Sequence, residues 1–209
     1  CSISPPAPGP DRLGVIPVGF GSDSEYLGPV GRWAYGRVFI DAACGARRQS
    51  AEAFRLAHAA ALLSAGDLRL VSIWSPTYFT TVLESLTDDR HAILARLGQL
   101  ARPKRVDKVR DAIEGGDFQA IWPDLKVISC WCDGPSAAPA KLLGEMFPNV
   151  EIQPKGLMAT EAVVSLKLAG VDDPVLAARS HVFEFIDVQS DQVVLPWALD
   201  VGRTYRVIV

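Results

Sequence analysis

The sequence predicts a mixed α/β fold in which a parallel βαβ unit is followed by antiparallel strands. Between residues 125 and 156, an apolar run, a short helical stretch and a second apolar run follow one another, which is the order of a βαβ unit. Residues 50–116 are mostly helical in their apolar spacing, and the residues after 162 form short apolar runs separated by turn residues. Helices are therefore expected in the first part of the chain and antiparallel strands in the last.

The first forty residues are predicted to be irregular chain, turns and short strands. Residues 1–14 are rich in proline and glycine, which favours an extended or irregular backbone. Residues 14–40 alternate short apolar runs with glycines, and "RVFI" (37–40) is the clearest strand among them. Asp23 and Glu25 lie in a turn of this region, but they are too few for a calcium site.

Four helices and one strand are predicted next. The first helix covers 50–68, with Ser50 as its N-cap and Gly66 at its end. A buried strand follows over 68–74. Three further helices are indicated by apolar residues that recur three and four positions apart, with Pro103 in the first turn of the last one. Their ranges are 77–86, 88–101 and 103–116.

The βαβ unit is predicted from residue 125 onwards. Its first strand is "LKVISCW" (125–131), its helix "AAPAKLLGEMF" (137–147) and its second strand "VEIQPKG" (150–156). Four later runs, separated by turns of Asp, Pro and Gly, are predicted as strands with no helix between them. They cover 163–168, 180–188, 192–196 and 204–209.

Composition and charge exclude several classes of protein. The chain has 209 residues, of which 49% are hydrophobic and 22% charged, as in ordinary globular proteins. Its net charge of −3, without a long run of either sign, gives no electrostatic footprint for nucleic acid. No apolar run reaches the roughly 18 residues that span a bilayer, so we expect no membrane association.

The cysteines indicate the redox environment of the protein, and the chain ends indicate whether the sequence is part of a longer protein. Cys1, Cys44, Cys130 and Cys132 are too few and too scattered for a disulfide framework, and "CWC" has no second pair to close a zinc site. A reducing, cytoplasmic setting is therefore expected. The start without Met or signal peptide, and the apolar run still in progress at Val209, predict an internal piece of a longer protein.

The three histidines give little support to hydrolase chemistry. His58, His91 and His181 do not stand near a Ser or Cys in the pattern of an activated nucleophile. His58 and His91 fall within predicted helices, where we expect them at the surface or its boundary.

The candidate site follows the two strands of the βαβ unit, because open α/β sheets bind ligands at the carboxyl ends of their strands. The first segment contains Asp133, Gly134, Pro135 and Ser136, a small-residue loop that lets a flat or anionic ligand approach the backbone amides. It leads into the N-terminus of the predicted helix.

The second segment is "LMATEA" (157–162), which supplies Thr160 and Glu161. A hydroxyl can donate to a phosphate oxygen, and a neighbouring carboxylate can hold Mg²⁺ that shares this phosphate. The same pair is also compatible with a solvated turn or a helix cap. Trp131, Met158 and Phe183 are further candidates for a pocket wall, with packing in the core as the alternative.

Four stretches together resemble the auxin-responsive Gretchen Hagen family of acyl acid amido synthetases, in its bacterial form. The upstream stretches "GSDSEYLGPVGRWAYGR" and "LRLVSIWSPTYFTTVLESL" also look like this family, so the resemblance covers nearly the whole chain. The four stretches are "IWPDLKVISCWCDG" (121–134), "FPNVEIQPKGLMATEA" (147–162), "HVFEFIDV" (181–188) and "LDVGRTYRVIV" (199–209).

This family belongs to the acyl-adenylate-forming enzymes, which share three signature stretches. A phosphate loop ending in Lys would lie before residue 1, and a Tyr-Arg-x-Gly-Asp type motif would lie beyond Val209. The third signature is an aromatic-Gly-x-Thr-Glu type motif. The stretch "LMATE" matches this motif at Thr160 and Glu161 and departs from it at Leu157 and Met158. The resemblance implies that residues 1–209 are the central part of the large domain, without the phosphate-loop region and the C-terminal domain with its catalytic Lys.

The resemblance also implies a two-step ligase that uses ATP and Mg²⁺. A carboxylic acid forms an acyl-AMP, and an amine, typically an amino acid, then displaces AMP to give an amide. Glu161 would bind Mg²⁺ and Thr160 the α-phosphate, while the ATP site would include the loop and the residues before the Thr-Glu pair. These are Asp133, Gly134, Pro135, Ser136, Leu157, Met158 and Ala159. The fragment alone is expected to be inactive, and the alternative is a non-enzymatic remnant or nucleotide-binding scaffold.

Overall fold

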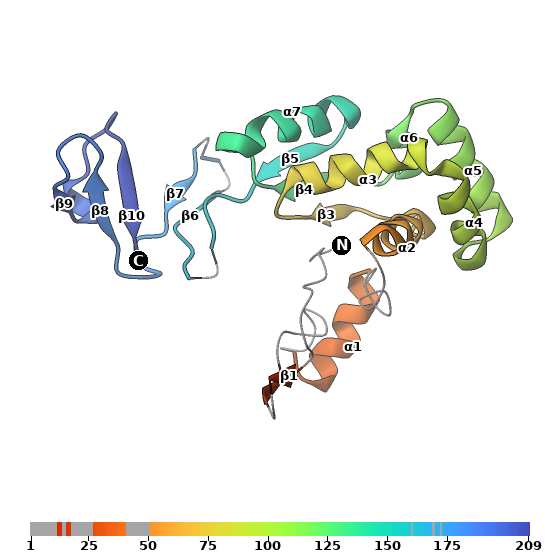
Figure 1. The fold of residues 1–209 in the computed structure, drawn as a ribbon, viewed down its shortest axis with the longest axis horizontal. Coiled ribbons are helices and arrows are strands. Elements are labelled where there is room, and N and C mark those ends of the chain that lie inside the picture. Colours follow the sequence, from red (N-terminus) through yellow and green to blue (C-terminus); the bar gives the residue numbers. More distant parts are fainter. Residues whose placement is uncertain are drawn as a thin grey trace. The chain divides into compact units, whose positions relative to one another are not determined.

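The computed structural model describes residues 12–13, 16–17, 27–40, 51–159, 161–168, 170–171 and 173–209. The chain divides into two compact units, Cys1–Gln153 and Pro154–Val209. The first contains a three-stranded parallel sheet with helices, and the second contains antiparallel sheets (Figure 1). The predicted mixed α/β class is thereby confirmed.

The parallel sheet of the first unit has the strand order β3-β4-β5. In the pairing of β3 with β4, Val71 lies opposite Ile128 and Ser72 opposite Ser129. The central strand β4 is the most deeply buried, because it has a neighbour on both sides. The strands are β3 (Leu70–Ser72), β4 (Val127–Cys130) and β5 (Glu151–Pro154), and the helix α7 (Ala137–Met146) joins β4 to β5 as predicted.

The helices α2 to α5 lie within a few residues of the predicted ranges. Pro103 stands in the first turn of α5, and Gly115 at its C-cap, as the sequence indicated. The predicted N-cap Ser50 lies outside the described residues. The helices are α2 (Ala51–Ser64), α3 (Pro76–Asp88), α4 (Arg90–Leu100), α5 (Pro103–Glu114) and the short, unpredicted α6 (Phe118–Ile121).

Three aromatic rings form the centre of this core. Phe79 of α3 stacks on Phe147 with 6.0 Å between ring centroids, and Trp122 lies 6.3 Å and 6.4 Å from these two rings. All three side chains are at most 1% exposed. Trp122 Nε1 also donates a hydrogen bond to the carbonyl of Leu62 at 3.3 Å, which satisfies its one polar group inside the core.

Arg105 of α5 binds the end of α2. Its guanidinium donates to the carbonyl oxygens of Leu63 at 2.8 Å, Ala65 at 3.2 Å and Ile121 at 2.8 Å. The last carbonyls of a helix have no partner within the helix, so a cation that binds them there is favourable. One side chain thus joins α2, α5 and the end of α6.

The predicted strand at 37–40 is wrong, because residues Pro29–Val38 form the helix α1. Two contacts that require helical spacing stabilise it: Tyr35 stacks on Phe39 at 4.3 Å, and the Arg37 guanidinium lies 4.6 Å from the centre of the Trp33 ring. The glycines of this stretch obscured the four-residue spacing. Upstream, β1 (Arg12–Leu13) and β2 (Ile16–Pro17) pair in antiparallel orientation.

The second unit contains the predicted antiparallel strands, in two small sheets. The strand β8 is central in the sheet β10-β8-β9, and β6 pairs with β7 in the other. The strand β7 falls in the turn-rich stretch that the sequence predicted as a connection. The strands are β6 (Ser165–Leu166), β7 (Val175–Leu176), β8 (Glu184–Asp187), β9 (Val193–Val194) and β10 (Tyr205–Ile208).

Phe183 and Phe185 form the core of this second unit together with Ala162 and Val164. Phe183 is 1% exposed, and its ring lies 6.3 Å from that of Phe185. Of the two roles weighed for Phe183, core packing is therefore the one observed. None of the described helices is long and apolar enough to cross a membrane.

His58 is buried, which corrects its expected position at the surface. It is 1% exposed, its Nδ1 lies 2.7 Å from the hydroxyl oxygen of Tyr78, and its ring stacks between Phe54 and Tyr78 at 5.9 and 5.6 Å. Its Nε2 has no hydrogen-bond partner among the described residues. Burial lowers the pKa of His58 to about 4, so the ring is neutral at neutral pH.

A glycine at the start of the second unit permits a close backbone approach. Gly156 has φ +76°, and a Cβ added there would lie 2.6 Å from the carbonyl oxygen of Ser165. The next residue, Leu157, donates its N–H to Ser165 Oγ at 2.8 Å. Only glycine tolerates both the left-handed backbone and this contact, so Gly156 fixes where residues 157–165 turn back on themselves.

The first prediction concerns Gly156→Ala. The matched control is Gly202→Ala, since Gly202 has φ +86° in the same unit but open space around its Cβ position. The control should lower the free energy of unfolding by about 1–2 kcal/mol through backbone strain alone. Gly156→Ala should cost about 1–3 kcal/mol more, because the methyl group overlaps the Ser165 backbone. Urea denaturation measures both, and equal losses would contradict the role of the close approach.

The second prediction concerns the pH dependence of stability. The unfolded chain protonates His58 near its ordinary pKa of 6.5, and the folded chain only near pKa 4. The unfolded state therefore binds more protons in this window, and the free energy of unfolding falls as the pH is lowered from about 6.5 to 4, by up to about 3 kcal/mol. His58→Gln should flatten this slope, whereas His91→Gln, at an exposed position of α4, should leave it unchanged. An unaltered slope in His58→Gln would refute the assignment.

Candidate functional site

Glu161 belongs to a hairpin whose described residues are 157–159 and 161–165. The carbonyl of Leu157 accepts hydrogen bonds from the N–H groups of Val164 and Ser165, both at 3.0 Å. Met158 pairs with Val163 as an antiparallel bridge, and Ala159 N–H donates to the Ala162 carbonyl at 2.9 Å. Glu161 therefore lies in the turn of the hairpin. Thr160, the other residue of the pair, lies outside the described residues.

This hairpin is packed on one side and exposed at its turn. Ala162 and Val164 are buried against Phe183 and Phe185, whereas Leu157 is 54% exposed and Glu161 is exposed as well. No helix follows Glu161 among the described residues of this stretch, so of the two alternatives for this residue the turn is the one observed. The core therefore holds the base of the hairpin and presents the carboxylate of Glu161 to solvent.

The loop after β4 has the open geometry that its small residues predicted. Gly134 has φ +54°, with nothing within 4 Å of the position of a Cβ, so a ligand could approach its backbone closely. Gly134–Ser136 form a 3₁₀ turn in which Ser136 N–H donates to the Asp133 carbonyl at 3.1 Å. The turn leads directly into α7, with Ser136 at its N-cap position and no side-chain capping bond.

The predicted site residues fall into two groups, one in each compact unit. Asp133, Gly134, Pro135 and Ser136 belong to the first unit, and Leu157, Met158, Ala159 and Glu161 to the second. Within each unit, the residues of a group lie next to one another in a single turn. Both turns are exposed, at residues 133–135 in the first and at Leu157 and Glu161 in the second.

Two tryptophans beside the first group contact each other, and the sequence analysis did not predict this contact. Trp131 N–H donates to the Trp74 carbonyl at 2.9 Å, and the two rings lie 5.6 Å apart. The signal was present in the sequence, because "VSIW" (71–74) and "ISCW" (128–131) each end on tryptophan at the carboxyl end of a strand. The parallel register of β3 and β4 brings these ends together. Trp131 is half-buried, between the two roles considered for it.

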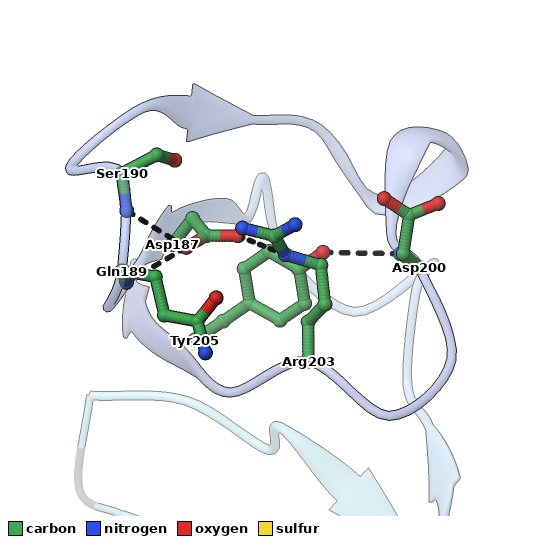
Figure 2. Close-up of polar contacts among 6 residues, drawn as sticks. All are labelled: Asp187, Gln189, Ser190, Asp200, Arg203 and Tyr205. Carbon is green, nitrogen blue, oxygen red and sulfur yellow. Dashed lines mark hydrogen bonds and ion pairs between the residues drawn. The ribbon is translucent and has the colours of Figure 1, made fainter.

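The carboxylate of Asp187 is buried in the second unit and accepts several hydrogen bonds (Figure 2). It accepts hydrogen bonds from Arg203 Nε and from the N–H groups of Gln189 at 2.8 Å and Ser190 at 3.0 Å. The bond from Arg203 is the main cause that holds the pKa of Asp187 well below its ordinary value. Arg206 forms a further ion pair with Asp191 at 2.9 Å. The Asp187 carboxylate is thus used internally to bind the turn after β8.

The exposed carboxylate of Glu161 is of the chemical type that binds Mg²⁺ together with phosphate oxygens. No group of three or more His, Cys, Asp or Glu side chains that could hold an ion occurs in the described part of the chain. Mg²⁺ is commonly bound by one or two carboxylates together with phosphate oxygens. An exposed carboxylate in a firmly held turn, such as that of Glu161, is compatible with this mode.

Comparison with known proteins identifies a shared fold. No family model matches the chain, and no curated protein does. Among solved structures, GH3.15 acyl acid amido synthetase matches with a TM-score of 0.64 and 14% identity, over 76% of this chain and 33% of that one. AtGH3.15 acyl acid amido synthetase in complex with 2,4-DB matches with a TM-score of 0.64 and 14% identity, over 78% and 34%. The chain therefore shares part of the fold of an acyl acid amido synthetase and spans about a third of the length of these structures.

Proposed function

We propose that residues 1–209 are the central part of the large domain of an ATP-dependent acyl acid amido synthetase of the Gretchen Hagen family, in its bacterial form. The enzyme would activate a carboxylic acid as acyl-AMP and transfer it to an amine such as an amino acid, in the cytoplasm. The observation that carries the proposal is the hairpin of residues 157–165. It exposes Glu161 at the point where the resemblance to this family predicts the Thr-Glu motif, in a chain that shares part of this fold.

Within this proposal, the two turns have separate tasks. Glu161 holds Mg²⁺, which neutralises charge on the phosphates of ATP when it is bound, and Thr160 contacts the α-phosphate. The loop of Asp133, Gly134, Pro135 and Ser136 borders the adenine, and Leu157, Met158 and Ala159 are assigned to ATP binding. Positioning the reactants in this way accounts for most of the catalytic contribution expected of a protein in such reactions.

The packing of the hairpin supports the role given to Glu161. A carboxylate assists catalysis best when it is held in place before the ligand binds, because no reorganisation is then needed. Ala162 is 4% exposed and Val164 8%, so the strand that follows Glu161 is held by the core of the second unit. The hydrogen bond from Ala159 N–H to the Ala162 carbonyl joins the two strands of the hairpin at the turn.

The third prediction tests this function in the complete protein that contains the chain. ATP–pyrophosphate exchange is measured against a panel of carboxylic acids, with Glu161→Ala as the test and Glu184→Ala as the matched control. Glu184 is an exposed carboxylate of β8 in the same unit. Acid-dependent exchange should fall about 10²- to 10³-fold in Glu161→Ala, the loss typical for a positioned electrostatic group, and remain in the control.

Two outcomes would contradict this function. If the folded complete protein shows no exchange with any acid, the chain is a remnant or scaffold without adenylation activity. If exchange occurs but is equal in Glu161→Ala and Glu184→Ala, Glu161 does not bind the reacting phosphates.

A further inference from the structure

Two thiols lie side by side at the carboxyl end of β4. Cys130 is its last residue and Cys132 follows two positions later, so both side chains point to the same side of the chain. Their sulfur atoms are 3.9 Å apart, and Cys132 Sγ also lies 3.5 Å from the Cys130 carbonyl oxygen. Cys130 is fully buried, whereas Cys132 is partly exposed. The pair is therefore reachable from the side of Cys132.

The separation of the sulfurs distinguishes two kinds of chemistry. In a disulfide the sulfurs are about 2.05 Å apart, so oxidation of this pair would require them to approach by nearly 2 Å. Two thiolates that bind one tetrahedral ion at about 2.3 Å lie about 3.8 Å from each other. The observed distance is that of two thiols in contact, and it is also close to the spacing that a chelate needs, so both sulfurs can bind one ion with little movement.

The surroundings decide what kind of ion fits. Thiolate ligands select soft, thiophilic metal ions over Mg²⁺ and Ca²⁺. Among the described residues no group of three or more His, Cys, Asp or Glu side chains could hold an ion, so the pair supplies two of the ligands. Burial is the main cause that raises the pKa of Cys132, and the nearby charge of Asp133 acts in the same direction. An ion that binds the two sulfurs as thiolates must displace their protons.

We propose that Cys130 and Cys132 form a two-thiolate chelating site for a thiophilic divalent metal ion, next to the loop of residues 133–136. The site is independent of the proposed adenylation chemistry, since neither thiol takes part in it. An ion bound there would hold Cys132 against the end of β4, and with it the start of the loop that begins at Asp133.

The test uses Cd²⁺ as the probe and the full chain with Cys1→Ser and Cys44→Ser, which removes the other two thiols. Cd²⁺ is added while the near-ultraviolet absorption of cadmium–thiolate bonds and the release of protons are recorded. We expect one saturating equivalent, an absorption step of two thiolates and the release of about two protons per ion. The affinity should rise with pH over the range below the thiol pKa.

Cys132→Ser is the decisive variant, because this side chain is partly exposed and its replacement leaves the core intact. It should remove the saturating step, and Cys130→Ala should do the same where circular dichroism shows that it is folded. Asp133→Asn, the matched control beside the pair, should keep both the stoichiometry and the two-thiolate absorption. Release of a single proton, the absence of saturation, or a step that survives Cys132→Ser would each overturn the proposal.

Discussion

The parallel pairing of β3 with β4 is the constraint on which the first unit depends. Because Val71 lies opposite Ile128 and Ser72 opposite Ser129, the two strands end side by side. Three features of this unit lie at or just beyond those strand ends: the tryptophan pair, the two thiols and the loop that leads into α7. A shift of the register by one residue would turn every side chain of a strand to the opposite face and separate these groups.

Much of this arrangement could be predicted from the sequence, because its signals are local. The helices α2 to α5 and α7 are indicated by their apolar spacing, α3 and α5 also by a proline in the first turn, and β4 by a continuous apolar run. The position of the loop and the Thr-Glu pair after these strands follows from the same pattern. The exposure of Glu161 in a turn agrees with the solvated position that the sequence allowed.

The remainder depends on contacts between distant residues, which periodicity does not record. The burial of His58 is set by Tyr78, twenty positions away on another helix, and that of Asp187 by Arg203, sixteen positions away. The helix α1 has no buried residue, so no apolar stripe marked it, and its side-chain pairs were interrupted by glycines. The two-residue strand β7 is too short to show any alternation.

The bond between Asp187 and Arg203 closes a loop of the second unit at its base. Within this loop, β9 contributes only two paired positions to the sheet, opposite Phe185 and Ile186. The ends of the loop are joined by this side-chain bond and by the backbone pairing of β8 with β10, in which Asp187 lies opposite Tyr205. Doubling the length of a flexible loop costs only about 0.6 kcal/mol once its ends are fixed. The segment around Trp197, which is 81% exposed, is therefore a place where insertions should be tolerated and where an affinity tag could be introduced without loss of the fold.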